Sequence, residues 1–289
     1  MGEARVVTQA REARFSAADI DTGISDADFQ AIAAIVRSNA GIVLGASKRD
    51  LVFGRLKRRL RVLGLCGFAE YRALLEGPDG AAEHSEMINA ITTNLTSFFR
   101  ETHHFAYLED PVLVRLLRDE PLRRLRIWSA ACSSGEEPYS ISMVLHKLLP
   151  DKTNHDARIL ATDIDSNMVD FAAKGVYPAE RTAAIPSKYA SCRANQTSDM
   201  VTMPDDLKRL ITFNQLNLLE PWPMKGPFDV VFCRNVVIYF DKDTQKTLFD
   251  RIADIMSPRG HLFIGHSETL FRTSDRFESL GRTMYRKLN

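Results

Sequence analysis

The stretch IWSAACSSGEEPYS, residues 127–140, determines how the rest of the chain is interpreted. An apolar run ends in small residues, a single glycine follows, and two adjacent glutamates come directly after it. In open parallel sheets, the turn after a buried strand is where nucleotides bind. A dinucleotide turn needs the pattern G-x-G-x-x-G, whereas Gly135 stands alone here. The stretch therefore predicts a nucleotide-like ligand of another kind.

The charges of Glu136 and Glu137 restrict that ligand further. At low dielectric constant the two carboxylates would repel a pyrophosphate. A nucleoside with positive charge and no phosphate fits better, and S-adenosylmethionine has both a sulfonium and an ammonium group that carboxylates complement. The alternative is that both glutamates only stabilise a helix N-terminus electrostatically.

The composition is that of an ordinary globular protein. The chain has 289 residues, of which 45% are hydrophobic, and a net charge of +1, so recognition by charge must come from local clusters. The four cysteines are widely spaced without a C-x-x-C pair, which disfavours zinc and disulfides and suits a reducing compartment. No apolar run approaches the ~20 residues of a membrane span, and residues 1–15 lack the apolar core of a signal peptide. We therefore expect a cytoplasmic protein that is not membrane-inserted.

The first part of the chain, up to about residue 118, is predicted to be helical. One helix has Ser25 as a candidate N-cap and ends at Gly41, and the next has Ser47 as the cap and ends at Gly64. Further helices are expected at residues 68–77 and 81–93 and from about Arg100. The predicted domain limits are a flexible tail at 1–23, a helical domain at 24–95, a linker or helix at 96–121, and an α/β domain at 122–289.

From Leu122 onward, short apolar runs alternate with helical patterns. This alternation predicts an α/β fold with a doubly wound, mostly parallel sheet. Residues 276–288 contain an extended pair without a crossover helix, which predicts an antiparallel edge. Residues 176–210 form a polar stretch with scattered prolines, and this stretch is too long for a connection of the usual ~4–6 residues. We therefore expect an inserted subdomain there.

Polar side chains follow the predicted strands at their carboxyl ends. Asp163 and Asp165 end the second strand; we favour Asp163 for a ribose and Asp165 as a helix cap, although Asp163 could instead cap that helix. The later strands end in polar residues whose partners are either backbone groups or a ligand, and their position favours the ligand: Asn217, Arg234, Asn235 and, just beyond, Tyr239.

Two other groups have alternative interpretations. Residues 48–61 contain seven cations against one acid, which exceeds what solubility needs and favours a binding role over a solvated helix face. The target could be nucleic acid or an acidic protein surface. His103 and His104 are adjacent, so on a helix they would point about 100° apart and could not share a metal. We expect no metal site.

Taken together, these residues resemble the CheR-type chemotaxis receptor methyltransferases. The matching segments cover nearly everything from residue 28 onward: AGIVLGASKRDLVFGRLKRRLRVLGL, NAITTNLTSFFRE, WSAACSSGEEPYS, ATDID, NLLEPWP, FCRNVVIYFD and LFIGHSE. The resemblance implies an enzyme that uses S-adenosylmethionine to esterify glutamates of bacterial chemoreceptors. It also implies a Rossmann-like methyltransferase sheet, an N-terminal helical domain and a small antiparallel β-subdomain within residues 176–210.

The resemblance also assigns residues to roles. The implied cofactor contacts are Asn94, Thr96, Arg100, Glu137, Asp163, Asn217, Leu218, Arg234 and Asn235. Arg100 and Tyr239 are implied to lie close to the transferred methyl group. The basic helix is implied to face the helical region of the receptor, through Lys48, Arg49, Arg55, Lys57, Arg58, Arg59 and Arg61.

Some members of the family also bind a short peptide at the receptor's C-terminus through a loop that contains glycine. The corresponding stretch here, CRANQTSDM, has no glycine, which argues against such tethering. Two rival functions are a nucleic-acid methyltransferase, prompted by the basic helix, and a non-catalytic regulator that binds S-adenosylmethionine. The stretch CRNV stands where a base methyltransferase would have an N/D-P-P-Y/F motif, so nucleic acid is not the expected partner.

Overall fold

The computed structural model describes residues 23–78, 80–114, 116, 124–149, 156–192, 196–197 and 199–288. The predicted tail at 1–23 lies outside these residues except for Gly23. The chain divides into two compact units between Thr92 and Thr93. Asn94 and Leu95, which the predicted limits assign to the helical domain, lie in the second unit. The domain limits themselves remain a proposal.

The first unit consists of helices. They are α2 (Asp26–Ala40), η2 (Ala46–Lys48), α3 (Arg49–Leu63), α4 (Phe68–Glu76) and α5 (Gly80–Ile91). Ser25 caps α2 by accepting the Asp28 N–H, and Gly41 ends it in the left-handed conformation, as predicted. The prediction for Ser47 was wrong, because a 3-10 turn occupies residues 46–48 and α3 begins without a side-chain cap. One face of each of the four α-helices α2, α3, α4 and α5 is buried in a common core, which includes Ile32, Leu56 and Tyr71.

The second unit is built on a seven-stranded sheet in the order β6-β2-β1-β7-β8-β10-β9. The strands are β1 (Arg124–Ala130), β2 (Asp156–Asp163), β6 (Ile211–Gln215), β7 (Phe228–Cys233), β8 (Met256–Ile264), β9 (Phe277–Gly281) and β10 (Met284–Lys287). The first five are parallel, and β10 and β9 are antiparallel at one edge. From β1 the chain adds β2 and β6 on one side and then crosses to β7 on the other side of β1. The strand order therefore reverses at β1, where such sheets bind ligands.

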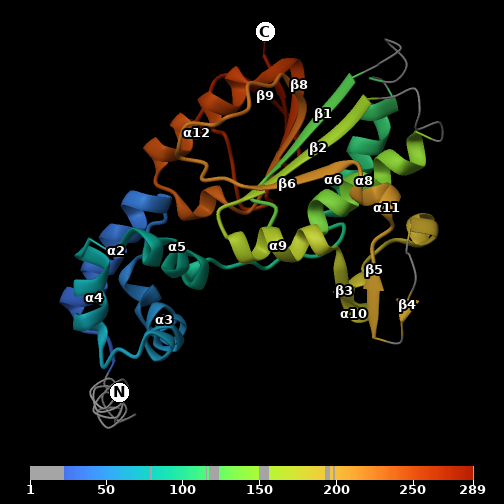
Figure 1. Ribbon diagram of the computed structural model, residues 1–289. Coiled ribbons are helices and arrows are strands. Elements are labelled where there is room, and N and C mark those ends of the chain that lie inside the picture. The colour runs from blue at the N-terminus through green and yellow to red at the C-terminus, as the bar shows by residue number, and fades with distance from the viewer. Residues whose placement is uncertain are drawn as a thin grey trace. The chain divides into compact units, whose positions relative to one another are not determined.

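Helices cover both faces of this sheet: Figure 1 shows α12 (Lys242–Asp254) on one side and α6 (Thr102–Tyr107) and α8 (Glu136–Leu148) on the other. Further helical elements of this unit are η3 (Leu108–Leu113), α9 (Ser166–Lys174) and η5 (Val237–Tyr239). Strand β1 is buried from Ile127 to Ala130, as expected for the centre of a sheet that helices cover on both faces. The predicted fold class is therefore confirmed.

The insertion forms a three-stranded antiparallel sheet in the order β3-β5-β4. Its elements are β3 (Val176–Pro178), α10 (Ala179–Thr182), η4 (Ser187–Cys192), β4 (Gln196–Thr197), β5 (Met200–Thr202) and α11 (Asp205–Lys208). It follows α9, and Tyr177 of β3 is buried in the core of the second unit. The inserted antiparallel subdomain is thus present where the polar stretch predicted it.

Candidate functional site

The turn between β1 and α8 has an unusual backbone. Ala131, Ser133 and Gly135 have φ angles of 63°, 50° and 94°, all in the left-handed region. A Cβ atom on Gly135 would lie 2.6 Å from the Ala172 Cβ and 2.8 Å from the Tyr177 hydroxyl. No other residue fits there. The glycine of the opening stretch therefore serves close packing of the turn, which begins α8 with its two glutamates buried.

Asp163 ties this turn to the end of β2. Its Oδ2 accepts the Ser133 N–H at 2.7 Å and its Oδ1 accepts the Asp165 N–H at 2.9 Å. Burial raises the pKa of Asp163 to about 6, against the effect of these hydrogen bonds. Asp165 caps α9 through the N–H groups of residues 167 and 168, as predicted, and accepts a hydrogen bond from Asn94 Nδ2 at 2.7 Å. Asn94 and Asp163 thus lie at the same strand end.

Glu137 and Arg234 form a buried ion pair across the ends of β1 and β7. Arg234 Nη1 donates to Glu137 Oε2 at 2.9 Å, and the Ser129 hydroxyl donates to Glu137 Oε1 at 2.7 Å. The Arg234 side chain is 2% exposed and that of Glu137 11%. Neighbouring Glu136 has a different environment, since it pairs with Arg181 of α10 and accepts the Ser134 hydroxyl. The two glutamates of the opening stretch are therefore not equivalent.

The segment that joins the two units along the chain brings Arg100 to the same edge of the sheet. Phe98 and Phe99 anchor it in the core of the second unit, and the Phe99 N–H donates to Ser140 Oγ at 2.9 Å. Arg234 Nη2 donates to the Arg100 carbonyl at 2.6 Å, while the Arg100 side chain donates to the Leu95 carbonyl. Arg100 is therefore fixed through its backbone, and its side chain is half-buried.

The remaining predicted residues are distributed as follows. Thr96 is half-buried in the same segment. Asn217 and Leu218 follow β6, which pairs with β2; the Asn217 side chain accepts the Leu219 N–H, and Leu218 is buried. Asn235 and Tyr239 follow β7, with Tyr239 in η5. The structure thus brings all the predicted cofactor residues to the ends of β6, β2, β1 and β7 and to the segment that carries Arg100.

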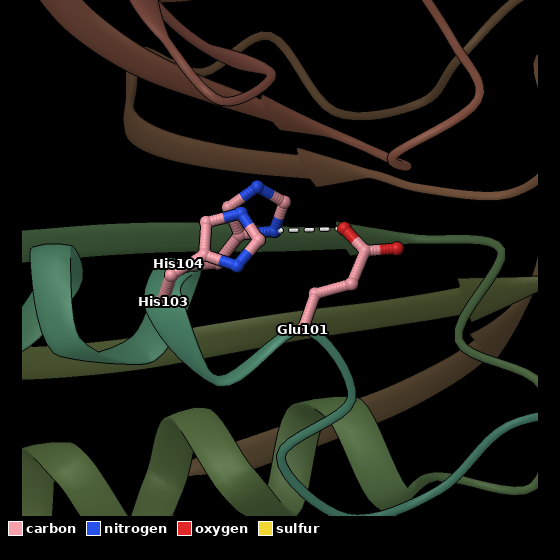
Figure 2. A group of neighbouring side chains, drawn as sticks. All are labelled: Glu101, His103 and His104. Carbon is pink, nitrogen blue, oxygen red and sulfur yellow. Dashed lines mark ion pairs between the residues drawn. The ribbon is translucent and has the colours of Figure 1, made fainter.

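A cluster around Glu101 lies at this edge and was missed from the sequence. Glu101 Oε2 lies 3.4 Å from Arg234 Nη2 and 3.4 Å from His104 Nδ1, and its Oε1 lies 3.1 Å from His266 Nδ1. Figure 2 shows the Glu101 carboxylate pointing toward the His104 ring, with the ring of His103 beside it. Burial and the nearby Arg234 charge lower the pKa of His104 to about 4, so the imidazole is neutral.

The adjacent rings of His103 and His104 have centroids only 4.2 Å apart, so the geometric reason given for excluding a shared metal does not hold. Their ligand atoms and those of Glu101 lie within 4.8 Å of one another, as a metal would require. However, Arg234 already pairs with the Glu101 carboxylate, and a divalent cation there would be repelled by the guanidinium in buried surroundings. We therefore infer that the cluster holds the Arg234 side chain in place through Glu101 and does not bind a metal.

The seven basic residues at 48–61 separate into three groups. Three are engaged within the first unit: Arg59 binds Glu83 with two hydrogen bonds of 2.7 and 2.6 Å, Arg49 pairs with Asp26, and Arg55 donates to backbone carbonyls at residues 91 and 92. Lys57 is half-buried against the Phe53 ring. The exposed members are Lys48, Arg58 and Arg61.

Comparison with known proteins agrees with this geometry. The model of the CheR methyltransferase SAM-binding domain matches residues 94–286, and that of the CheR methyltransferase all-alpha domain matches residues 27–92. A probable chemotaxis protein methyltransferase of Rhizobium etli is 45% identical over 258 residues, which is 87% of this chain and 96% of the relative.

Two further relatives have similar coverage. Chemotaxis protein methyltransferase 2 of Pseudomonas aeruginosa is 43% identical over 89% of this chain and 92% of its own length. The chemotaxis protein methyltransferase of Escherichia coli is 40% identical over 91% of both chains. None of the helices in the described residues is long and apolar enough to cross a membrane. The chain belongs to the CheR family of S-adenosylmethionine-dependent chemotaxis methyltransferases.

Proposed function

We propose that this enzyme transfers the methyl group of S-adenosylmethionine to glutamate side chains of bacterial chemoreceptors. The observation that carries the proposal is the set of carboxylates and amides at the ends of four adjacent strands, within the residues that match the SAM-binding domain. The acceptors would be in the cytoplasmic helical region of the receptors, which places the enzyme in the cytoplasm.

The residues at the strand ends fit this cofactor better than a phosphate-bearing nucleotide. Asp163 is ionised at neutral pH, since its raised pKa is only about 6, and such a carboxylate can accept both ribose hydroxyl protons. Glu137 supplies negative charge for the cofactor's ammonium group, although Arg234 offsets part of that charge. Asn94, Thr96, Asn217, Leu218 and Asn235 would complete the contacts to the nucleoside and the amino acid.

The chemistry requires alignment more than proton transfer. When bound, S-adenosylmethionine would supply a methyl group on a positively charged sulfur; the carboxylate oxygen that accepts the methyl becomes a methyl ester, the sulfur–methyl bond breaks, and S-adenosylhomocysteine leaves. A glutamate has an unperturbed pKa of ~4.3, so it arrives ionised and needs no general base. Arg100 would guide the incoming carboxylate, and Tyr239 would donate a hydrogen bond beside the methyl group. Because charge is neutralised in the transition state, a strong Arg100–carboxylate pair would favour the ground state, so Arg100 positions rather than activates.

The exposed basic residues Lys48, Arg58 and Arg61, with Lys57 beside them, would contact the receptor's helical region, while Arg49, Arg55 and Arg59 would support that surface. The predicted peptide loop, residues 192–200, lies partly outside the described residues, and its lack of glycine still argues against a peptide tether.

The test is replacement of Arg100 by alanine. We expect Arg100→Ala to lower methyl transfer at saturating cofactor by about tenfold to a hundredfold, because a misplaced acceptor loses alignment. The melting temperature should change little, since the backbone of residue 100 is what binds Arg234. Turnover close to that of the unaltered enzyme would remove Arg100 from the mechanism.

The same assay separates the rival functions. Methyl-labelled S-adenosylmethionine is offered to receptor-containing membranes, to RNA and to DNA. We expect label in the receptor as a base-labile ester. Base-stable label in nucleic acid would instead show a nucleic-acid methyltransferase, and cofactor binding without transfer would show a regulator.

A further inference from the structure

Glu268 is a buried carboxylate that the mechanism above does not use. It lies in the turn after β8, in the sequence GHSE, and is 6% exposed. The Glu268 N–H donates to the Gly265 carbonyl at 2.9 Å, so the turn returns its side chain to the end of the strand. An ionised side chain in such a place needs partners that compensate for its lost hydration.

Those partners are backbone N–H groups from two loops. Oε2 accepts from Gly265 at 2.5 Å and from Asn235 at 3.0 Å, while Oε1 accepts from Val237 at 3.1 Å. Burial raises the pKa of Glu268, and the backbone N–H groups oppose that rise. Strands β7 and β8 are parallel neighbours, so one carboxylate joins the loops that follow both of them.

The loop after β7 would be hard to hold without this carboxylate. Asn235 has a φ of 59°, in the left-handed region, which asparagine adopts more readily than most residues other than glycine. The Asn235 side chain lies against Gly265, where a Cβ atom would come within 2.4 Å of Asn235 Nδ2. On the opposite side of the loop, Gln245 of α12 donates to the carbonyls of Val237 and Phe240 at 2.8 and 3.0 Å.

We propose that Glu268 is a positioning residue for methyl transfer: by accepting the N–H groups of Asn235 and Val237, it fixes the loop that presents Asn235 to the cofactor and Tyr239 to the methyl group. This inference rests on the proposed roles of Asn235 and Tyr239. In this proposal Glu268 acts through the loop and not by contact with the cofactor or the acceptor, because its buried carboxylate accepts backbone N–H groups of that loop.

The experiment uses Glu268→Gln in the full chain. Glutamine has nearly the same shape, but its NH2 group cannot accept, so it loses either the Val237 bond or the Asn235 and Gly265 bonds. We expect the turnover number to fall about tenfold to a hundredfold and cofactor affinity to fall about tenfold, while the KM for the receptor stays unchanged. A purely structural role would lower the melting temperature without this separation of turnover number from receptor KM.

Asp229→Asn is the matched control. Asp229 lies at the other end of β7, and its carboxylate accepts the Arg126 N–H at 2.9 Å and the Ser257 hydroxyl at 2.7 Å. This substitution should cost stability without changing turnover. If Glu268→Gln does not fold, Glu268→Asp, which keeps the charge but withdraws the oxygens, is measured in its place and should show the same losses to a smaller degree.

The results separate two failures. If the Glu268 variant binds cofactor and turns over as Asp229→Asn does, while Asn235→Ala and Tyr239→Phe are impaired, Glu268 is only structural and the inference is wrong. If Asn235→Ala and Tyr239→Phe are themselves unimpaired, the proposed site is wrong and the inference falls with it.

Discussion

Glu83 in the first unit and Glu137 in the second are both buried glutamates paired with an arginine, but the two ion pairs differ in the origin of their partners along the chain and in the exposure of the arginine. Glu83 of α5 binds Arg59 of α3 and accepts the Tyr71 hydroxyl at 2.8 Å. Its partners come from helices that pack on one another in a small core. The Arg59 side chain remains 23% exposed, so this pair lies at the boundary of the core.

Glu137 has a partner that is 97 residues away in the sequence, and that partner is itself held by other groups. Arg234 binds Glu137, the Arg100 carbonyl and Glu101, and its side chain is 2% exposed. The first pair can be removed at the expense of packing in one unit. The second pair joins three segments that carry predicted functional residues. Removing Glu137 should therefore disturb the position of those residues and weaken cofactor binding.

The largest effect is expected from Glu137→Ala, compared with Glu83→Ala. Removing Glu137 leaves the Arg234 charge buried, at a cost of about 3–5 kcal/mol, and should abolish measurable cofactor binding. Removing Glu83 leaves Tyr71 without its acceptor and frees Arg59 to reach water, at a cost of about 1–3 kcal/mol. Thermal unfolding and calorimetric titration with S-adenosylmethionine measure both quantities. Loss of cofactor affinity in Glu83→Ala, or its retention in Glu137→Ala, would contradict the distinction between the two pairs.

A smaller effect is expected from pH, through Asp163. Because burial raises its pKa to about 6, the carboxyl group becomes protonated in the folded protein as the pH falls below that value. A protonated carboxyl group cannot accept both ribose hydroxyl protons. We therefore expect cofactor affinity to be about tenfold weaker at pH 5 than at pH 8, from the fraction ionised. Calorimetry across this range measures it, with Asp163→Asn as the control that should bind weakly and show no such dependence; equal affinities at both pH values would remove Asp163 from the ribose contact.

The sequence was a good guide to the two units for different physical reasons. Helical periodicity and glycine stops predicted α2 because its cap is local: Ser25 and Asp28 are three residues apart. Position at strand ends predicted Glu137, Asp163 and Arg234 because parallel strands bring their carboxyl ends to one edge whatever the connections between them. Neither argument needs knowledge of which residues are neighbours in space.

The groups that support the site could not be found in this way. Glu268 binds backbone N–H groups, which have no sequence signature, and the segment LFIGHSE that contains it contributed only to the family resemblance. Glu101 meets Arg234 and His266, which are more than 130 residues away along the chain. The two histidines beside it were judged by helix geometry alone, although the His104 ring is hydrogen-bonded to Arg282 and Thr283, in the distant turn between β9 and β10.

The smallest effect is expected at the surface of the first unit, where the comparison between buried and exposed charge can be made within one helix. Arg58 and Arg61 are exposed and one turn apart on α3, whereas Arg59 between them binds Glu83. The double variant Arg58→Glu, Arg61→Glu should raise the KM for receptor methylation several-fold, most strongly at low salt, and alter the free energy of unfolding by no more than about 0.5 kcal/mol. Cofactor affinity should not change.

Arg59→Glu is the matched variant on the same helix. It places a carboxylate beside Glu83 and Glu86, so the first unit should lose stability, as thermal unfolding would record. Any rise in its receptor KM should therefore accompany a lower melting temperature, whereas the exposed pair should raise the KM alone. If the exposed pair leaves the KM unchanged at low salt, the basic run serves the fold and solubility, and the receptor must be recognised through another surface.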